Sequence, residues 1–151
     1  MAQIRVLHIL HTMNRGGTEN AIMNYYRHID RERIQFDFLL TDPNKCAFED
    51  EIISLGSIIH RVPRLTMSNP TPYLKGVDHF FKIHPEYRIV HVHQDCMSAV
   101  ILKVAQKNGI RVRIAHSHNS SQEKNIKYPI KLYFKRQIVR FATDCFACGK
   151  E

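Results

Sequence analysis

Tryptophan is absent from this sequence of 151 residues, and cysteine occurs only four times. Four cysteines are too few for the disulfide framework of a small secreted domain, so the cytoplasm is the expected location. No apolar run approaches the roughly 20 residues that cross a bilayer, and the first residues lack the layout of a signal peptide. Six glycines and six prolines are too few for a collagen-like or low-complexity chain. The sequence therefore predicts a globular cytoplasmic protein.

The charge of the sequence is unbalanced. Twenty-two lysines and arginines stand against fourteen acidic residues, which leaves a formal net charge of +8 with the ten histidines neutral. This charge permits a non-enzymatic interpretation: a basic binding module for polyanions, either nucleic acid or an anionic membrane. No RNP, KH or helix-turn-helix pattern is visible, so nucleic acid is not the expected partner.

Short apolar runs alternate with segments of helical periodicity along the chain. Runs rich in β-branched residues predict strands at residues 4–10, 34–40, 57–62, 88–93, 112–116 and 143–147. Apolar residues three and four positions apart predict helices at residues 18–29, 48–55, 73–84, 97–108 and 129–141. The prolines of residues 63–72 predict a loop, and Gly109 is the expected end of the fourth helix.

Strands that are separated by helices must be parallel, because a hairpin connection is short. The pattern predicts an α/β fold with a doubly wound, mostly parallel, Rossmann-like sheet and helices on both faces. No repeat or linker divides residues 1–151, which we expect to form one domain. The last strand is followed by only a few residues and no covering helix, so we expect this domain to be the first half of a longer protein.

The loop after the first strand has the composition of a ligand-binding turn. Gly16 and Gly17 stand immediately before the first helix. Glycines let the backbone approach another molecule closely, and the free amides at a helix N-terminus attract phosphate groups. The loop matches neither the dinucleotide-binding G-x-G-x-x-G motif nor the P-loop. A ligand contact and a plain helix start, with Thr18 as N-cap, are both open at this point.

Three motifs occur in the order found in a known family. Residues 14–20 read N-R-G-G-T-E-N, residues 88–93 read R-I-V-H-V-H, and residues 113–119 read R-I-A-H-S-H-N. Together they resemble family 4 glycosyltransferases of the GT-B fold, in particular the bacterial capsular and exopolysaccharide branch. The resemblance covers essentially all 151 residues.

The resemblance implies a retaining enzyme that transfers a hexose from a nucleotide-sugar to a glycan or lipid-linked acceptor in polysaccharide biosynthesis. Residues 1–151 would form the amino-terminal, acceptor-side half of the GT-B fold. The nucleotide-sugar domain, with its Glu-x7-Glu motif, would lie outside this sequence, so the fragment alone is expected to be inactive. No cofactor is expected, because the nucleotide-sugar is a co-substrate.

The resemblance also assigns roles to individual residues. Gly16 and Gly17 match a glycine pair that faces the donor diphosphate and sugar, and His118 matches a histidine near the transferred sugar, which makes it the predicted catalytic residue. A neutral imidazole would donate to a sugar hydroxyl, whereas a protonated one would stabilise diphosphate charge. The predicted acceptor cleft contains Asn14, Arg15, His93, Asn119 and Ser120.

Two H-x-H pairs, His91 with His93 and His116 with His118, should each point to one face of a strand. Transition metals bind such imidazoles. The alternating α/β layout argues against the metallo-hydrolases that share part of this pattern, so no metal is predicted. We expect His91 and His116 to have packing roles.

The remaining histidines and cysteines receive structural interpretations. His8 is expected in the core and His28 at the surface. Cys145 and Cys148 have C-x-x-C spacing, but they lie on a predicted strand and no second pair exists. We therefore expect two packed thiols rather than a zinc or redox site.

Residues 126–141, which contain the last predicted helix, are basic, with Lys127, Lys131, Lys135, Arg136 and Arg140 and no acidic residue. The apolar residues of the helix are three or four positions apart and form a face that we expect to cover the sheet. The basic side would attract anionic lipid head groups, with about 1 kcal/mol for each basic residue near the surface. This predicts a peripheral, electrostatic association with the inner face of the plasma membrane.

Overall fold

In the computed structural model, which describes residues 3–66, 70–118 and 128–148, six strands alternate with five α-helices. The strands are β1 (Ile4–Leu10), β2 (Ile34–Leu40), β3 (Ile59–Arg61), β4 (Ile89–Val92), β5 (Val112–Ser117) and β6 (Asp144–Ala147). The helices are α1 (Gly17–His28), α2 (Glu49–Ser54), α3 (Thr71–Ile83), α4 (Ser98–Lys107) and α5 (Tyr128–Phe141), with a 3₁₀ turn η1 (Asp95–Met97) before α4. Each of these strands and α-helices was predicted from the sequence.

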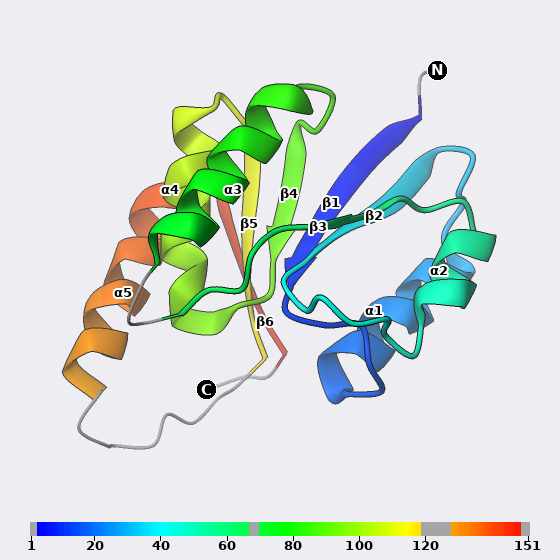
Figure 1. Ribbon diagram of the computed structural model, residues 1–151, viewed down its shortest axis with the longest axis horizontal. Helices are drawn as coiled ribbons and strands as arrows, with labels where there is room; N and C mark the ends of the chain where they lie inside the picture. Colours follow the sequence, from blue (N-terminus) through cyan, green and yellow to red (C-terminus); the bar gives the residue numbers. More distant parts are fainter. Residues whose placement is uncertain (1–2, 67–69, 119–127, 149–151) are drawn as a thin grey trace.

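All six strands are parallel and follow the order β3-β2-β1-β4-β5-β6 (Figure 1). The chain therefore builds outward from β1 to β3, crosses back through α3, and continues outward from β4 to β6. This confirms the doubly wound, Rossmann-like sheet. The reversal of direction beside β1 is the switch point at which α/β proteins bind ligands.

The helices α3, α4 and α5 cover one face of the sheet (Figure 1). Leu7 and Ile9 of β1 share a buried core there with Phe80 of α3. Ile138 and Phe141 of α5 pack against the same core, as the apolar face of that helix predicted. Among the described residues, no helix combines the length and apolar character needed to cross a membrane.

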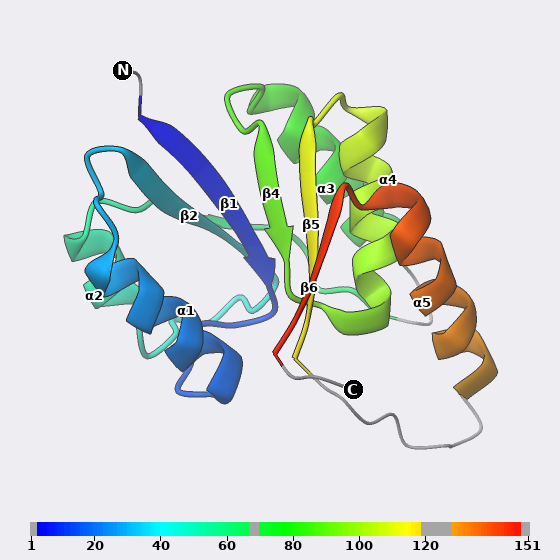
Figure 2. The same cartoon turned by 180° about the vertical axis from the view of Figure 1, so that it is seen from behind.

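The helices α1 and α2 cover the other face, beside β1 and β2. Met23 and Tyr26 of α1 pack there with Phe38 and Leu40 of β2. In Figure 2 the strands β4, β5 and β6 are seen from this side, and no helix of the described part of the chain lies in front of them. On this uncovered half, Phe146 of β6 is 50% exposed.

The structure corrects one local prediction, excludes one N-cap that the sequence left open, and confirms the end of α4. Helix α3 begins at Thr71, inside the predicted proline loop, because a proline in the first turn needs no intrahelical hydrogen bond. Helix α1 begins with Gly16 as its N-cap and without a side-chain cap, so Thr18 is not the cap. Gly109 follows the end of α4 with a φ of +77°, as predicted for a glycine that terminates a helix.

Candidate functional site

The carboxyl ends of β1, β4 and β5 lie at one edge of the sheet (Figure 2). The loop after β1 contains Gly16 and leads into α1, His93 follows β4, and His118 follows β5. Parallel strands end at the same edge, so the fold brings the three motifs of the sequence together at the expected ligand-binding position.

Strand register places five histidines on the face that α1 covers in part. His8 of β1 pairs with His91 of β4, and the register of β4 with β5 continues so that His93 lies beside His116. The rings of His91 and His116 stack with centroids 5.2 Å apart, and those of His116 and His118 with centroids 4.1 Å apart. We call these five residues the histidine ladder. The two H-x-H pairs share a face as predicted, and His8, which is buried as predicted, joins them.

The histidine ladder and the thiol of Cys148 form one continuous chain of polar contacts. Nδ1 of His8 lies 3.0 Å from Nε2 of His93, and Nδ1 of His93 lies 2.8 Å from Nε2 of His118. Nδ1 of His118 lies 3.2 Å from Sγ of Cys148. The same sulfur lies 3.2 Å from Nε2 of His116, whose Nδ1 lies 3.1 Å from Nε2 of His91.

One protonation pattern satisfies this whole chain of contacts. Nε2 of His8 is buried and has no partner among the described residues. Because an unpaired buried N–H is rarer than an unpaired acceptor, we assign the proton of His8 to Nδ1, from which it donates to His93. His93, His118 and His116 then also donate from Nδ1, the thiol of Cys148 donates to His116, and Nε2 of His91 accepts from His116. All five rings are neutral in this pattern.

The electrostatics agree with neutral rings. Desolvation is the largest cause of a lowered pKa in every member of the histidine ladder. Burial and the neighbouring rings lower the pKa of His91 to about 4. Desolvation also lowers the pKa of His118, while the carboxylates of Asp95 and Glu19 act in the opposite direction. His118 is therefore neutral at neutral pH and has two acidic neighbours.

The glycine turn is open beside Gly17. Neither Gly16 nor Gly17 has a left-handed backbone conformation, so what matters is the missing side chain. A Cβ at Gly17 would meet no atom within 4 Å, whereas one at Gly16 would meet the carboxylate of Glu19. The first amides of α1 are uncapped by any side chain and can accept an anion at the Gly17 side, with Glu19 as a competing negative charge.

Asn14 and Arg15 lie just before the glycines and are both exposed. The side-chain oxygen of Asn14 accepts a hydrogen bond from the backbone N–H of Ala47 at 2.9 Å. The backbone oxygen of Asn14 accepts one from the N–H of Gly16, also at 2.9 Å. Asn14 therefore shapes the glycine turn, and its amide oxygen is already engaged.

Asp95 has a strained backbone at the same edge of the sheet. Its φ of +42° makes it the one non-glycine residue with a positive φ in the described part of the chain. Such a conformation costs about 1–3 kcal/mol and is concentrated at functional sites. Asp95 opens η1, two residues after His93, and so belongs to the loop that borders the histidine ladder.

Not every predicted site residue can be placed. Asn119, Ser120 and Lys127 are outside the described residues, as is the side chain of Lys131. The other basic residues of α5, which are Lys135, Arg136 and Arg140, are exposed. Their helix covers the face of the sheet opposite the histidine ladder, so they do not join the site (Figures 1 and 2).

The prediction of two packed thiols is wrong. Cys145 and Cys148 are both exposed. They are three positions apart in an extended segment, so their side chains point to opposite faces of the sheet. Cys145 pairs with Ala115 of β5, whereas Cys148 contacts His116 and His118.

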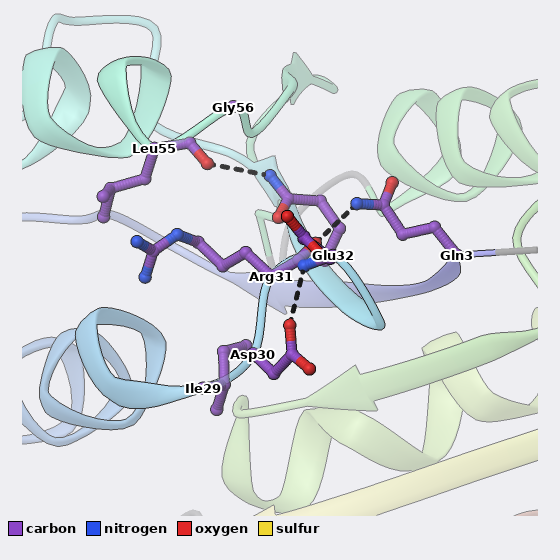
Figure 3. Close-up of a pocket in the computed structure, with 8 residues that line it drawn as sticks. Gln3, Ile29, Asp30, Arg31, Glu32, Leu55 and Gly56 are labelled. Carbon is purple, nitrogen blue, oxygen red and sulfur yellow. Dashed lines mark hydrogen bonds between the residues drawn. The ribbon is translucent and has the colours of Figure 1, made fainter.

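A hollow of about 570 Å³ lies at the other edge of the sheet, where β1 and β2 begin (Figure 3). Its polar groups bond to one another. The side-chain amide of Gln3 donates to the backbone oxygen of Arg31 at 2.6 Å, and the backbone N–H of Glu32 donates to the Asp30 carboxylate at 3.1 Å. The hollow also lies at the edge opposite the carboxyl ends of the strands, where ligands of α/β proteins bind, so it is not the candidate site.

Comparison with known proteins agrees with the motifs. No family model matches the chain. The chain is 39% identical over 153 residues to EpsF of Bacillus subtilis (strain 168), whose name assigns it provisionally as a glycosyltransferase. It is 30% identical over 121 residues to the capsular polysaccharide biosynthesis glycosyltransferase CapH of Staphylococcus aureus. This chain is homologous to bacterial proteins named as glycosyltransferases, one of them of capsular polysaccharide biosynthesis. The alignments cover 99% and 80% of the chain, which spans 40% of EpsF and 32% of CapH.

Solved structures of glycosyltransferases share the fold of this homologue. Phytolacca americana UGT2, complexed with UDP-2-fluoro-glucose and pterostilbene, aligns over 97% of the chain and 48% of its own, with a TM-score of 0.64 and 11% identity. A mutant O-GlcNAc transferase of Thermobaculum terrenum aligns over 79% of the chain and 24% of its own, with a TM-score of 0.53 and 11% identity. At this identity the likeness shows the fold, which is one Rossmann-like half of GT-B.

In this glycosyltransferase homologue, the fold gathers four of the predicted residues at one edge: Gly16, Gly17, His93 and His118. Sequence analysis missed the neighbours that surround them, which are His8, Glu19, Asp95 and Cys148. Strand parity is the one signal that could have placed His8 on this face. The other three depend on loop conformation and on which strands are neighbours.

Proposed function

We propose that this chain is the acceptor-side domain of a retaining glycosyltransferase of exopolysaccharide or capsule biosynthesis. The enzyme would transfer a hexose from a nucleotide-sugar to a glycan or lipid-linked acceptor, and a second domain outside residues 1–151 would bind most of the donor. Homology to EpsF and CapH supports this proposal. The chain also spans less than half of either relative, which leaves room in them for a second domain.

The observation that carries the proposal is the common position of the α1 N-terminus and His118. Glu19, in the first turn of α1, influences the pKa of His118, so the two motifs are electrostatic neighbours. A nucleotide-sugar lying across this edge would meet uncapped amides at Gly17 with its diphosphate and the imidazole of His118 with its sugar. Rate acceleration would come from positioning the sugar and stabilising the leaving diphosphate.

His118 would act as a neutral hydrogen-bonding group. Its lowered pKa favours contact with a sugar hydroxyl over the cationic role toward diphosphate. Both ring nitrogens already have partners, His93 at 2.8 Å and Cys148 at 3.2 Å. A sugar hydroxyl must therefore replace one of these contacts, and the exposed thiol of Cys148 is the easier one to displace.

A matched pair of histidine variants tests this role in the protein that contains this chain. His118→Ala should lower transfer by about 100-fold or more, the scale for loss of one preorganised donor, with little change in unfolding. His28→Ala is the control, because His28 is exposed in the last turn of α1, far from Gly17. Transfer is measured with a labelled nucleotide-sugar, and folding by circular dichroism. Unchanged turnover in folded His118→Ala would remove His118 from the site.

We also propose that α5 contributes a peripheral contact with anionic membrane. Lys135, Arg136 and Arg140 are exposed, while Ile138 and Phe141 pack toward the sheet. With its apolar face occupied, the helix would contact lipid through charge alone.

A further inference from the structure

The histidine ladder collects more imidazole nitrogens than recognition of one sugar requires. His93, His116 and His118 each offer a ring nitrogen, and these atoms all lie within 4.8 Å of one another. In a tetrahedral zinc site with Zn–N bonds of about 2.0–2.1 Å, the ligand nitrogens lie about 3.3 Å apart. Nδ1 of His93 and Nε2 of His118 are 2.8 Å apart, so a small separation of the rings would admit an ion between them.

Cys148 borders the three imidazoles but is not one of the donors. Its Sγ lies 3.2 Å from Nε2 of His116 and 3.2 Å from Nδ1 of His118, whereas the nitrogen of His118 that faces His93 is Nε2, on the other side of the ring. Cys148 is exposed, and it stands on the half of the sheet that no described helix covers, so an ion can reach the site from solvent.

We propose that His93, His116 and His118 bind a transition metal ion, with Zn²⁺ the preferred ion. Three imidazoles suit Zn²⁺ and its transition-metal neighbours, whereas Ca²⁺ and Mg²⁺ require oxygen ligands. The sequence predicted no metal because its alternating α/β layout differs from that of the metallo-hydrolases. That layout does not show that β4 and β5 are neighbours, or in which register they pair.

The remaining two histidines would orient the ligands. With the ion on Nε2 of His116, the Nδ1–H of that ring donates to Nε2 of His91, 3.1 Å away. With the ion on Nδ1 of His93, the proton of that ring moves to Nε2 and is donated to Nδ1 of His8, 3.0 Å away, and the proton of His8 moves to its unpaired Nε2, which reduces the net gain from this contact. Loss of such an outer partner lowers metal affinity by about 10–100-fold, so His91 and His8 are positioning residues.

Metal binding can be measured without any transfer assay, and it does not rest on the proposed function. Protein stripped with EDTA is titrated with Zn²⁺ by calorimetry and with Co²⁺ by absorbance, because d–d bands report tetrahedral Co²⁺ and a charge-transfer band reports a bound thiolate. We expect one ion per chain. His116→Gln should weaken binding by at least about 100-fold and His91→Gln by about 10-fold, since the latter removes only an outer partner. His28→Gln is the matched control and should bind like the unaltered protein.

Cys148→Ser provides a second control that leaves the three imidazoles in place. It should change the Zn²⁺ affinity less than tenfold, and no thiolate charge-transfer band is expected in the unaltered protein. The site itself is overturned if the stripped protein binds no Zn²⁺ or Co²⁺, or if folded His116→Gln binds as tightly as His28→Gln.

Discussion

Asp37 is the centre of a buried polar network, and its replacement should be strongly destabilising. Its side chain is fully buried and accepts hydrogen bonds from Nε and Nη2 of Arg5 at 2.6 and 2.7 Å. The hydroxyl of Tyr87 donates to the same carboxylate at 2.9 Å, and the backbone N–H of Ile58 donates to it at 2.8 Å. The network connects β1, β2, the start of β3 and the segment before β4.

The size of the effect follows from what Asp37→Ala leaves behind. The guanidinium of Arg5, the hydroxyl of Tyr87 and the amide of Ile58 would all lose their acceptor. Breaking a buried ion pair costs about 3–5 kcal/mol. The side chain of Arg5 is 26% exposed, so water can recover part of that loss. We therefore expect the free energy of unfolding to fall by about 3–4 kcal/mol, a large share of the roughly 5–15 kcal/mol of a typical domain.

Urea unfolding followed by circular dichroism measures this change, and the chain contains a matched control. Arg27 and Glu51 make a similar two-point ion pair, at 2.5 and 2.8 Å, but their side chains are 36% and 37% exposed. Glu51→Ala should cost no more than about 1 kcal/mol, the usual range for a surface pair.

A double-mutant cycle isolates the coupling between the charges. Combining Arg5→Ala with Asp37→Ala should cost at least about 1 kcal/mol less than the sum of the single changes, because the double variant leaves no uncompensated charge. If Asp37→Ala costs no more than Glu51→Ala, or if the two changes in the buried pair are additive, the reasoning is refuted.

Three further predictions concern the turn, the basic helix and one titrating group. Gly17→Ala should change the free energy of unfolding by no more than about 1 kcal/mol, because an added Cβ meets no atom within 4 Å. The same variant should lower the transfer rate, because the donor diphosphate is proposed to approach that amide. An unchanged transfer rate would argue against the contact. The protein should pellet with anionic vesicles at low salt but not at high salt. Replacing Lys135, Arg136 and Arg140 by Gln should reduce the pelleted fraction. Equal pelleting with neutral and anionic vesicles would contradict this prediction. Desolvation and the neighbouring His84 lower the pKa of His60, so its NMR titration midpoint should lie below 6.5. As the pH falls below 6.5, the unfolded chain takes up this proton first and the free energy of unfolding decreases, and the decrease should be less steep in His60→Gln. A midpoint above 6.5 contradicts the burial argument.

Most of the fold could be predicted because its signals are local. Each strand is an apolar run, each helix has apolar residues three or four positions apart, and parallel pairing follows from their alternation. The start of α3 was mistaken, because proline excludes the interior of a helix but not its first turn, and the sequence alone does not tell the two positions apart. The prediction for the thiols of Cys145 and Cys148 was wrong because the two residues are three positions apart. In an extended segment an odd spacing places side chains on opposite faces.

The candidate site was half predictable for a different reason. Leu7 and Ile9 of β1, like Val90 and Val92 of β4, are buried under α3 and α4 on one face of the sheet. Alternation then places His8 of β1, and His91 and His93 beside Val90 and Val92, on the opposite face. What the sequence does not contain is the order of the strands, and only that order makes β1, β4 and β5 neighbours. The apolar core of one face therefore determines the direction of the imidazoles, while the topology of the sheet determines that they meet.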